Sequence, residues 1–217
     1  MSEKITEFTI LGERCSGTNF LEDSMTTNFT IPLVWKYGWK HWFGYSDFKG
    51  TDNVLFIGII RDPIVWVNSF KNKPHHVHNT IARDKDKFLN GEFWSTAGKN
   101  DNPNENMHTR NFTNGERYKN IMEMRSVKLH YLRETMPTKV KNYILIRYED
   151  FCDDYQGTLE KIMEEFNLEK KTEGEEFLNG IKKKGGSYKH QYTDEEILNH
   201  ASFDIEEEKK MGYCLDK

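Results

Sequence analysis

The chain has 217 residues, 36% hydrophobic and 30% charged, which is typical of a folded domain with its own core rather than of a disordered chain. A formal net charge of −4 argues against a general affinity for nucleic acid or anionic membranes, so an anion site must come from local clustering. Three scattered cysteines suggest neither a disulfide framework nor a zinc site, and no apolar stretch approaches the roughly 18 residues of a membrane span. We therefore expect a cytoplasmic protein that binds neither nucleic acid nor membrane.

The first quarter of the chain predicts a strand, a loop and a helix in succession. Residues 8–11 form a β-prone run that ends at Gly12, and a helical pattern follows from about residue 18 to residue 28. A second short strand is expected over residues 31–35. Residues 54–60 are continuously apolar, which is typical of a central strand covered on both faces.

The rest of the chain alternates helices and strands around one polar region. A helix is expected to start at Pro63 and to stop before Pro74, because proline suits a first helical turn and not a helix interior. Residues 71–120 are polar, and we interpret them as loops and short helices that form a substrate lid; a surface excursion without function is the alternative. Further helices are expected over 121–135, 156–166, 193–200 and 205–211, and a strand over 143–147.

This order predicts the fold class. Strands that alternate with helices form a mostly parallel sheet with helices on its faces. We therefore expect an α/β protein in which residues 1–217 form one domain.

The loop between the first strand and the first helix has the spacing of a phosphate-binding loop. Gly12 and Gly17 enclose four residues, and the loop stands between a strand and a helix, as such a loop requires. A nucleotide kinase or ATPase would continue with Lys and Ser/Thr, which contact the phosphates and Mg²⁺, whereas this chain continues with Thr18 and Asn19. We expect backbone N–H groups to bind an anion without a metal, with Ser16, Thr18 and Asn19 as further donors. An ordinary turn with a capping Ser or Thr is the alternative.

A second candidate anion site follows the apolar strand. Arg61 ends that strand, and Ser69 lies eight residues later, about two turns into the next helix. A guanidinium offers paired donors to a phosphate, and a hydroxyl offers another. Both would lie at the carboxyl edge of the sheet, where open α/β sheets bind ligands. The alternative is a structural Arg61 that pairs with Asp62 or with a helix end.

In their order along the chain, these motifs resemble those of the sulfotransferases that use 3′-phosphoadenosine 5′-phosphosulfate (PAPS). Ser16-Gly17-Thr18 is similar to the family's loop for the 5′-phosphosulfate, and Arg61-Asp62-Pro63 with Ser69 is similar to its site for the 3′-phosphate. The resemblance implies a P-loop-like sulfotransferase fold over most of the chain. It extends to three later stretches: Tyr148-Glu149-Asp150, the basic loop with Lys183, Lys184 and Gly185, and Glu208 with Gly212-Tyr213. In the family, the loop similar to this basic loop closes over the 3′-phosphate.

One position departs from the family's pattern. Cytosolic members place a Lys, and many membrane-bound members an Arg, immediately before Ser-Gly-Thr, where this chain has Cys15. We expect Arg14 to reach the bridging oxygen of the donor by a different route. Cys15 is included among the donor-binding residues of the loop, and a small side chain buried in the core is the alternative. Phe20 falls where the family often stacks an aromatic ring on adenine, and at helical spacing it can equally belong to the core.

The resemblance also implies the chemistry. A sulfuryl group would pass from PAPS to a hydroxyl or amine, leaving adenosine 3′,5′-bisphosphate, with no metal. The family commonly uses a His, or in some branches a Glu, as base. Its cytosolic members carry a K-T-H segment about twenty residues before the Arg, and Lys40-His41 has a similar distance before Arg61. His41 is therefore the predicted base and Lys40 the predicted partner of the sulfuryl oxygens. A solvated turn over aromatic side chains is the alternative, and the rival bases are His75, His76 and His78.

Two other function classes stay open from the sequence. One is a P-loop nucleotide kinase or hydrolase, against which the missing Lys and Mg²⁺-holding residue count. The other is a non-catalytic nucleotide-binding protein of the same fold, since a scaffold does not guarantee activity. For an enzyme, the expected partner is a small-molecule or carbohydrate acceptor.

Overall fold

The computed structural model describes residues 4–97, 107–172, 176–178 and 189–215, which belong to two compact units. The first unit comprises Met1–Arg61 and Tyr131–Gly186, and the second comprises Asp62–His130 and Ser187–Lys217. The organisation as one domain stays a prediction. No helix in the described ranges is long and apolar enough to cross a membrane.

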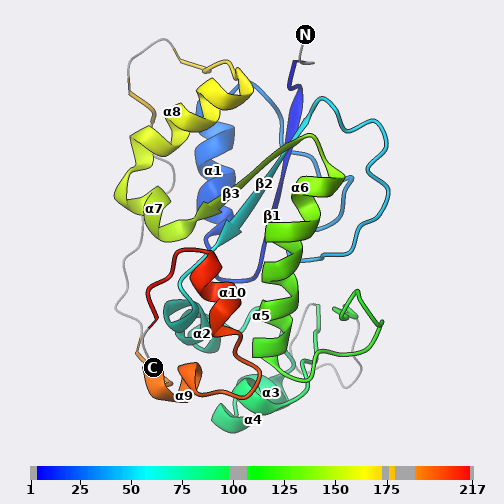
Figure 1. Ribbon diagram of the computed structural model, residues 1–217, viewed down its shortest axis with the longest axis vertical. Coiled ribbons are helices and arrows are strands. Elements are labelled where there is room, and N and C mark those ends of the chain that lie inside the picture. Colours follow the sequence, from blue (N-terminus) through cyan, green and yellow to red (C-terminus); the bar gives the residue numbers. More distant parts are fainter. Residues whose placement is uncertain (1–3, 98–106, 173–175, 179–188, 216–217) are drawn as a thin grey trace. The chain divides into compact units, whose positions relative to one another are not determined.

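A parallel sheet of three strands forms the centre of the first unit (Figure 1). Strands β1 (Glu7–Gly12), β2 (Val54–Ile60) and β3 (Asn142–Arg147) follow in the order β1-β2-β3, with Phe8 opposite Leu55 in the register. Every residue of β2 is buried, because this strand has a neighbour on each side and a covered face above and below. The predicted α/β class with a parallel sheet is confirmed.

Helices α1 (Thr18–Asn28), α7 (Tyr148–Asp153) and α8 (Tyr155–Phe166) cover one face of this sheet (Figure 1). Side chains alternate between the two faces of a strand, so one face of each strand packs against these helices. The resulting core contains Phe8, Ile10, Leu21, Met25, Leu55, Ile57, Ile59, Ile146, Phe151, Leu159 and Ile162.

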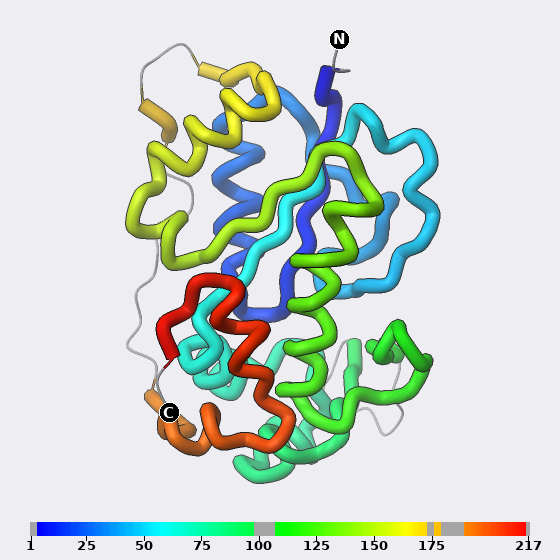
Figure 2. The backbone as a smooth tube through the Cα atoms, in the orientation of Figure 1, coloured from blue at the N-terminus to red at the C-terminus, as the bar shows by residue number. Residues whose placement is uncertain are grey.

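The opposite face is covered by the long loop of residues 29–53, which Figure 2 traces, and by the π-helical turn η1 (Tyr131–Thr135). Phe56 on this face lies 5.1 Å from Tyr37, measured between ring centroids. The hydroxyl of Tyr143 crosses the same face and donates to the Leu132 carbonyl at 2.7 Å. The sheet is therefore covered on both sides by residues of its own unit.

The strand predicted over residues 31–35 was wrong. Leu33 forms a single parallel bridge with Phe8, held by the Phe8 N–H to Pro32 carbonyl bond (3.0 Å) and the Val34 N–H to Phe8 carbonyl bond (2.8 Å). Pro32 has no N–H with which to extend a ladder. The segment therefore lies along the edge of β1 without becoming a fourth strand.

The helix expected over 121–135 ends later than predicted. It is divided into α5 (Ile121–His130), the turn η1, and α6 (Met136–Lys139), so helical backbone continues through Pro137. Pro137 is in the first turn of α6, where a missing N–H leaves no helical bond unmade. The expected stop before this proline was wrong for that reason.

The second unit is helical in the part that the structure describes. Among its helices are α2 (Pro63–Asn72), α3 (Asn79–Ala82), α4 (Lys85–Asn90), α5, α9 (Asp194–Leu198) and α10 (Ile205–Lys210). The helices expected after Pro63 and near residues 193–200 and 205–211 are confirmed, as are short helices and loops in the described part of 71–120. Inside the unit, Arg125 Nη2 donates to Glu208 Oε2 at 2.8 Å, and its guanidinium lies over the ring of Trp66.

Candidate anion-binding site

The loop from Gly12 to Asn19 leaves β1 and enters α1, as the sequence predicts. Gly17 immediately precedes the helix with φ 98°, a left-handed conformation that favours glycine. A Cβ atom on Gly17 would also overlap the ring of Tyr148. Glycine is therefore required at this position for two independent reasons.

Gly12 permits a close approach at the start of the loop. A Cβ atom there would lie 2.7 Å from Thr18 Cγ2 and 2.8 Å from the Ile59 carbonyl oxygen. These distances are shorter than van der Waals contact allows. The loop can therefore lie against the end of β2 only with glycine at residue 12.

The N-terminus of α1 has no side-chain cap among the described residues. The hydroxyl of Ser16, the nearest capping candidate, donates to the Glu13 carbonyl at 2.6 Å instead, and the Ser16 N–H bonds the same oxygen at 3.1 Å. The first N–H groups of a helix lack intrahelical acceptors, and the helix dipole adds partial positive charge there. This end of α1 therefore presents backbone donors that suit an anion.

Arg14 is turned into the protein. Its side chain is fully buried, donates from Nη1 to Glu13 Oε1 at 2.8 Å, and lies 5.4 Å from the ring centroid of Trp39. Glu13 also accepts from the backbone N–H of Arg14 at 2.7 Å. The contact expected between Arg14 and the donor's bridging oxygen stays a prediction, and this ion pair holds the Arg14 guanidinium inside the protein. The sequence did not single out Glu13, whose carboxylate decides where Arg14 points.

Arg61 reaches the loop from the end of β2. Its Nη1 donates to the Cys15 carbonyl at 3.1 Å, and its guanidinium lies 4.7 Å from the ring centroid of Tyr148. Cys15 is half-buried and has a left-handed backbone conformation with φ 63°. In this conformation its carbonyl oxygen accepts from Arg61. Arg61 therefore lies beside the loop at the carboxyl end of the sheet, the edge at which the sequence analysis placed it.

Tyr148 is a site residue that the sequence noted only as part of a motif. It begins α7 directly after β3, and its ring lies against Gly17 and under Arg61. Burial, with a hydrogen bond to Cys152, raises the pKa of Tyr148 to about 12, although the charge of Arg61 acts in the opposite direction. The phenol is therefore neutral near pH 7 and offers the guanidinium an aromatic face.

The turn from Trp39 to Trp42 brings Lys40 and His41 to the carboxyl end of β1. The Gly12 N–H donates to the Lys40 carbonyl at 2.9 Å, and His41 Nδ1 lies 2.6 Å from the Gly12 carbonyl oxygen. Because a carbonyl oxygen only accepts, the proton of the neutral ring is on Nδ1, and Nε2 is the basic nitrogen. The predicted base is thus beside the first residue of the loop.

The ammonium of Lys40 lies at the first turn of α1. It donates to Asn19 Oδ1 and, at 2.8 Å, to Glu22 Oε2, and only 11% of the side chain is exposed. Glu22, which the sequence did not predict, partly offsets the charge of Lys40. Lys40 therefore adds a positive charge near the end of α1 that the loop leaves uncapped.

Phe20 lies in an aromatic cluster. Its ring centroid is 4.9 Å from Phe151, 5.8 Å from Tyr155 and 6.1 Å from Tyr148. These contacts favour the core interpretation over adenine stacking. The ring is still half-buried rather than fully enclosed.

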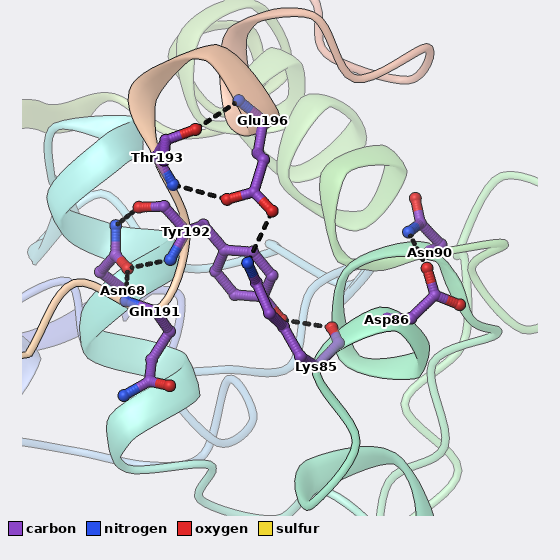
Figure 3. A network of polar contacts seen from close by, with 8 residues as sticks. All are labelled: Asn68, Lys85, Asp86, Asn90, Gln191, Tyr192, Thr193 and Glu196. Atoms are coloured by element: carbon purple, nitrogen blue, oxygen red, sulfur yellow. Dashed lines mark hydrogen bonds and ion pairs between the residues drawn. The ribbon is translucent and has the colours of Figure 1, made fainter.

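Ser69 belongs to the second unit, where it is buried in α2. On the same helix, Asn68 Oδ1 accepts the N–H groups of Gln191 and Tyr192 at 2.6 and 3.0 Å, as Figure 3 shows. Asn72 Nδ2 donates to the Lys189 carbonyl at 2.8 Å. The chain that follows the basic loop is therefore attached to the helix of Ser69, whereas Lys183, Lys184 and Gly185 themselves lie outside the described residues.

The rival histidines have structural contacts in the second unit. His78 caps α3 and stacks on Trp94 with ring centroids 4.2 Å apart, and His76 Nδ1 lies 3.2 Å from the Thr96 carbonyl oxygen. His75 is exposed. No group of three or more metal-ligating side chains occurs in the part of the chain that the structure describes.

Within the first unit, the structure thus brings one set of predicted residues to the carboxyl ends of the strands. The residues gathered at this edge of the sheet are Gly12, Cys15, Ser16, Gly17, Thr18, Asn19, Lys40, His41 and Arg61, with Tyr148 in addition.

Comparison with models of known protein families, with curated protein sequences and with solved structures finds no match to this chain.

Proposed function

We propose that the protein is a sulfotransferase that uses PAPS and a hydroxyl or amine acceptor. The observation that carries the proposal is the N-terminus of α1, which no side chain among the described residues caps. The helix begins after a left-handed Gly17 and has Lys40 at its first turn. A phosphate-binding loop of this shape, without the Lys and Mg²⁺-holding residue of a P-loop nucleotidase, suits an anion that needs no metal. The P-loop-like sulfotransferase architecture is part of the same proposal.

The residues of the first unit fit the phosphosulfate end of such a donor. The backbone N–H groups of Gly17, Thr18 and Asn19 would hold its oxygens, because glycine at residue 17 lets the backbone approach closely. Arg61 carries five N–H donors on its guanidinium and would add charge at the loop. The 3′-phosphate contacts that the resemblance assigns to Arg61, Ser69 and the basic loop stay predictions.

The transfer itself needs a positioned base and stabilisation of the leaving phosphate. PAPS supplies an activated sulfuryl group. The acceptor oxygen forms the new O–S bond as the bond from sulfur to the bridging oxygen breaks, and that electron pair leaves on the 5′-phosphate. His41 Nε2 takes the acceptor's proton, and the orientation of its ring is fixed by Gly12. Lys40 and the first turn of α1 stabilise the charge that develops on the transferred and leaving groups.

Binding of adenosine 3′,5′-bisphosphate tests the donor site. It should bind without Mg²⁺ and raise the melting temperature more than ATP does, since a ligand of the native state stabilises that state. Arg61→Ala should weaken it by roughly 30- to 150-fold, the equivalent of about 2–3 kcal/mol for a charged contact. Equal stabilisation by ATP, or a strict need for Mg²⁺, would favour a nucleotide kinase.

Substitution of His41 tests the base. His41→Asn keeps a side-chain N–H that can donate to the Gly12 carbonyl, but it has no basic nitrogen. Turnover with a working acceptor should fall by about 10²- to 10⁴-fold, while bisphosphate affinity stays within about threefold. His75→Asn serves as the control, and a comparable loss in that variant would contradict the assignment.

A further inference from the structure

Glu22 holds the ammonium of Lys40 against α1. Its Oε2 accepts from Lys40 Nζ at 2.8 Å, and Asn19 Oδ1, one turn earlier on the same helix, accepts from the same nitrogen. Side chains three residues apart share one face of a helix, so these two oxygens receive the ammonium together. Two of the three N–H donors of the ammonium are thus directed at α1.

The rest of Lys40 is also fixed. The Gly12 N–H donates to its carbonyl at 2.9 Å, and the ring centroid of Trp35 lies 5.7 Å from its ammonium. A cation over an indole face is attracted to the ring. The charge of Lys40 is therefore placed beside the first two turns of α1, next to the helix end that would bind the donor.

Two acid–base pairs lie next to the loop, and they differ in their access to water. The side chains of Glu13 and Arg14 are 9% and 0% exposed, whereas those of Glu22 and Lys40 are 34% and 11% exposed. Water can solvate the Glu22 carboxylate when its cation turns away, so separation of this pair costs little free energy. Separation of the buried pair leaves a charge without solvent. Lys40 is therefore the cation that can exchange partners.

The Glu22 carboxylate limits what Lys40 offers to an anion. The positive and negative charges of the pair largely cancel, which leaves the helix end with its own partial positive charge. An anion at the start of α1 would compete with this carboxylate for one cation. The affinity of the site for anions therefore depends on Glu22 as well as on Lys40.

We propose that Glu22 is a positioning residue that holds Lys40 beside the start of α1 and yields it to the donor, an inference that rests on the proposed sulfuryl transfer. When an anion occupies the helix end, the ammonium turns from Glu22 toward the anion and keeps its bond to Asn19. Glu22 itself does not touch the reacting atoms. Because the same carboxylate competes with the product, it also favours release of adenosine 3′,5′-bisphosphate after transfer.

Glu22→Gln tests the charge of this residue, because its amide oxygen still accepts from Lys40. Calorimetric titration at low ionic strength should show bisphosphate binding that is about 3- to 10-fold tighter than in the wild type, with most of the gain in a slower dissociation rate. The gain should shrink in about 1 M salt, which screens exposed charges. Glu165→Gln, the same change at an exposed residue of α8, should leave the affinity unchanged.

A double-mutant cycle shows whether Glu22 acts through Lys40. Lys40→Met should weaken bisphosphate binding at least about threefold more in the Glu22→Gln protein than in the wild type, because only there is the ammonium released from a competing carboxylate. A purely structural role of Glu22 would lower the melting temperature and leave this coupling at zero. The melting temperature of each variant, measured without ligand, shows that the variant is folded.

The outcomes separate this inference from the proposed function. If the wild type binds bisphosphate and Glu22→Gln binds it equally or more weakly, the role of Glu22 is overturned and the sulfotransferase proposal stands. Equal effects of Lys40→Met in the two backgrounds would overturn it as well. Failure of the wild type to bind bisphosphate would overturn both proposals.

Discussion

The two helices that follow β1 and β2 begin in opposite ways. At the start of α2, the Asp62 carboxylate accepts the Val65 N–H at 2.9 Å, and Pro63 occupies the first turn. At the start of α1, Gly17 is left-handed and no described side chain serves as a cap. The Asp62 carboxylate closes the start of α2, whereas no described side chain accepts from the first N–H groups of α1.

Under the proposed function, this difference would separate a helix end that is only structural from one that binds the donor. A carboxylate at a cap satisfies an orphan donor and would repel an anionic ligand at the same place. In the Arg61-Asp62-Pro63 motif, therefore, the Asp and Pro begin α2, while the Arg contacts the other loop. Under the proposed function, these two similar strand-to-helix joints would serve different purposes, and one capping side chain would distinguish them.

The largest effect is expected from Gly17→Ala. Besides a left-handed cost of about 1–2 kcal/mol, the new methyl group overlaps Tyr148, which adds about 1–3 kcal/mol. Bisphosphate affinity should also fall more than about tenfold, since the loop must move. Denaturant unfolding and calorimetric titration measure the two quantities.

Gly50→Ala is the matched control for Gly17→Ala. Gly50 is also left-handed, with φ 69°, but has open space where its Cβ would be placed. It should show the left-handed cost alone and full bisphosphate affinity. Equal losses of stability in the two variants would mean that the contact with Tyr148 does not constrain the loop.

A smaller effect is expected from Asn19→Asp, which gives α1 the negative charge that α2 already has. The new carboxylate keeps an acceptor for Lys40 and favours the helix dipole, so stability should be unchanged or slightly higher. Bisphosphate affinity should fall by about 5- to 30-fold, because two anions compete for one helix end. Asn53→Asp makes the same charge change at the residue before β2, and it should leave affinity unchanged.

Removing the cap of α2 should change stability and leave ligand binding intact. Asp62→Ala should lower the free energy of unfolding by about 1 kcal/mol, and Asp62→Asn by less, because asparagine also caps. Bisphosphate affinity should stay within about threefold in both variants. A large loss of affinity in the asparagine variant would assign Asp62 to the ligand rather than to the helix.

The smallest effect concerns acid sensitivity at another carboxylate cap. The Lys87 N–H bond lowers the pKa of Asp84, which caps α4. A lowered carboxyl pKa contributes stability above the unfolded value near 3.8, and that stability is lost as the pH falls through the folded pKa. Asp84→Asn should therefore flatten the loss of stability below about pH 4 and leave the value at pH 7 nearly unchanged. An unchanged slope would contradict the pKa shift.

Local patterns were sufficient for most of the elements and for part of the site. The continuous apolar run at 54–60 predicted a buried strand, and the Gly12 to Gly17 spacing placed the loop at a strand-to-helix joint. The position of His41 before Arg61 led to a residue that does lie beside Gly12. The strand predicted over 31–35 failed because Pro32 has no N–H with which to extend the ladder beyond the Leu33 bridge.

The contacts that decide how these residues act could not be predicted in the same way. Glu13 holds Arg14 inside, and Tyr148, more than eighty residues after both of its neighbours in the chain, lies against Gly17 and Arg61. Glu22 and Asn19 set the position of Lys40. Each is a choice of partner among several side chains of suitable charge or shape, and sequence spacing carries no information about that choice.

The sequence by itself determined that a glycine loop follows the first strand, that an arginine ends the second, and that helices alternate with a parallel sheet. These features depend on backbone conformation and on the period of apolar residues, which are local properties. Only the tertiary structure decided that Arg14 is buried, that Arg61 lies over Tyr148, and that no side chain in the described part of the chain caps the start of α1. Those outcomes depend on which groups meet after the chain has packed, because each side chain takes the partner that burial and geometry bring within reach.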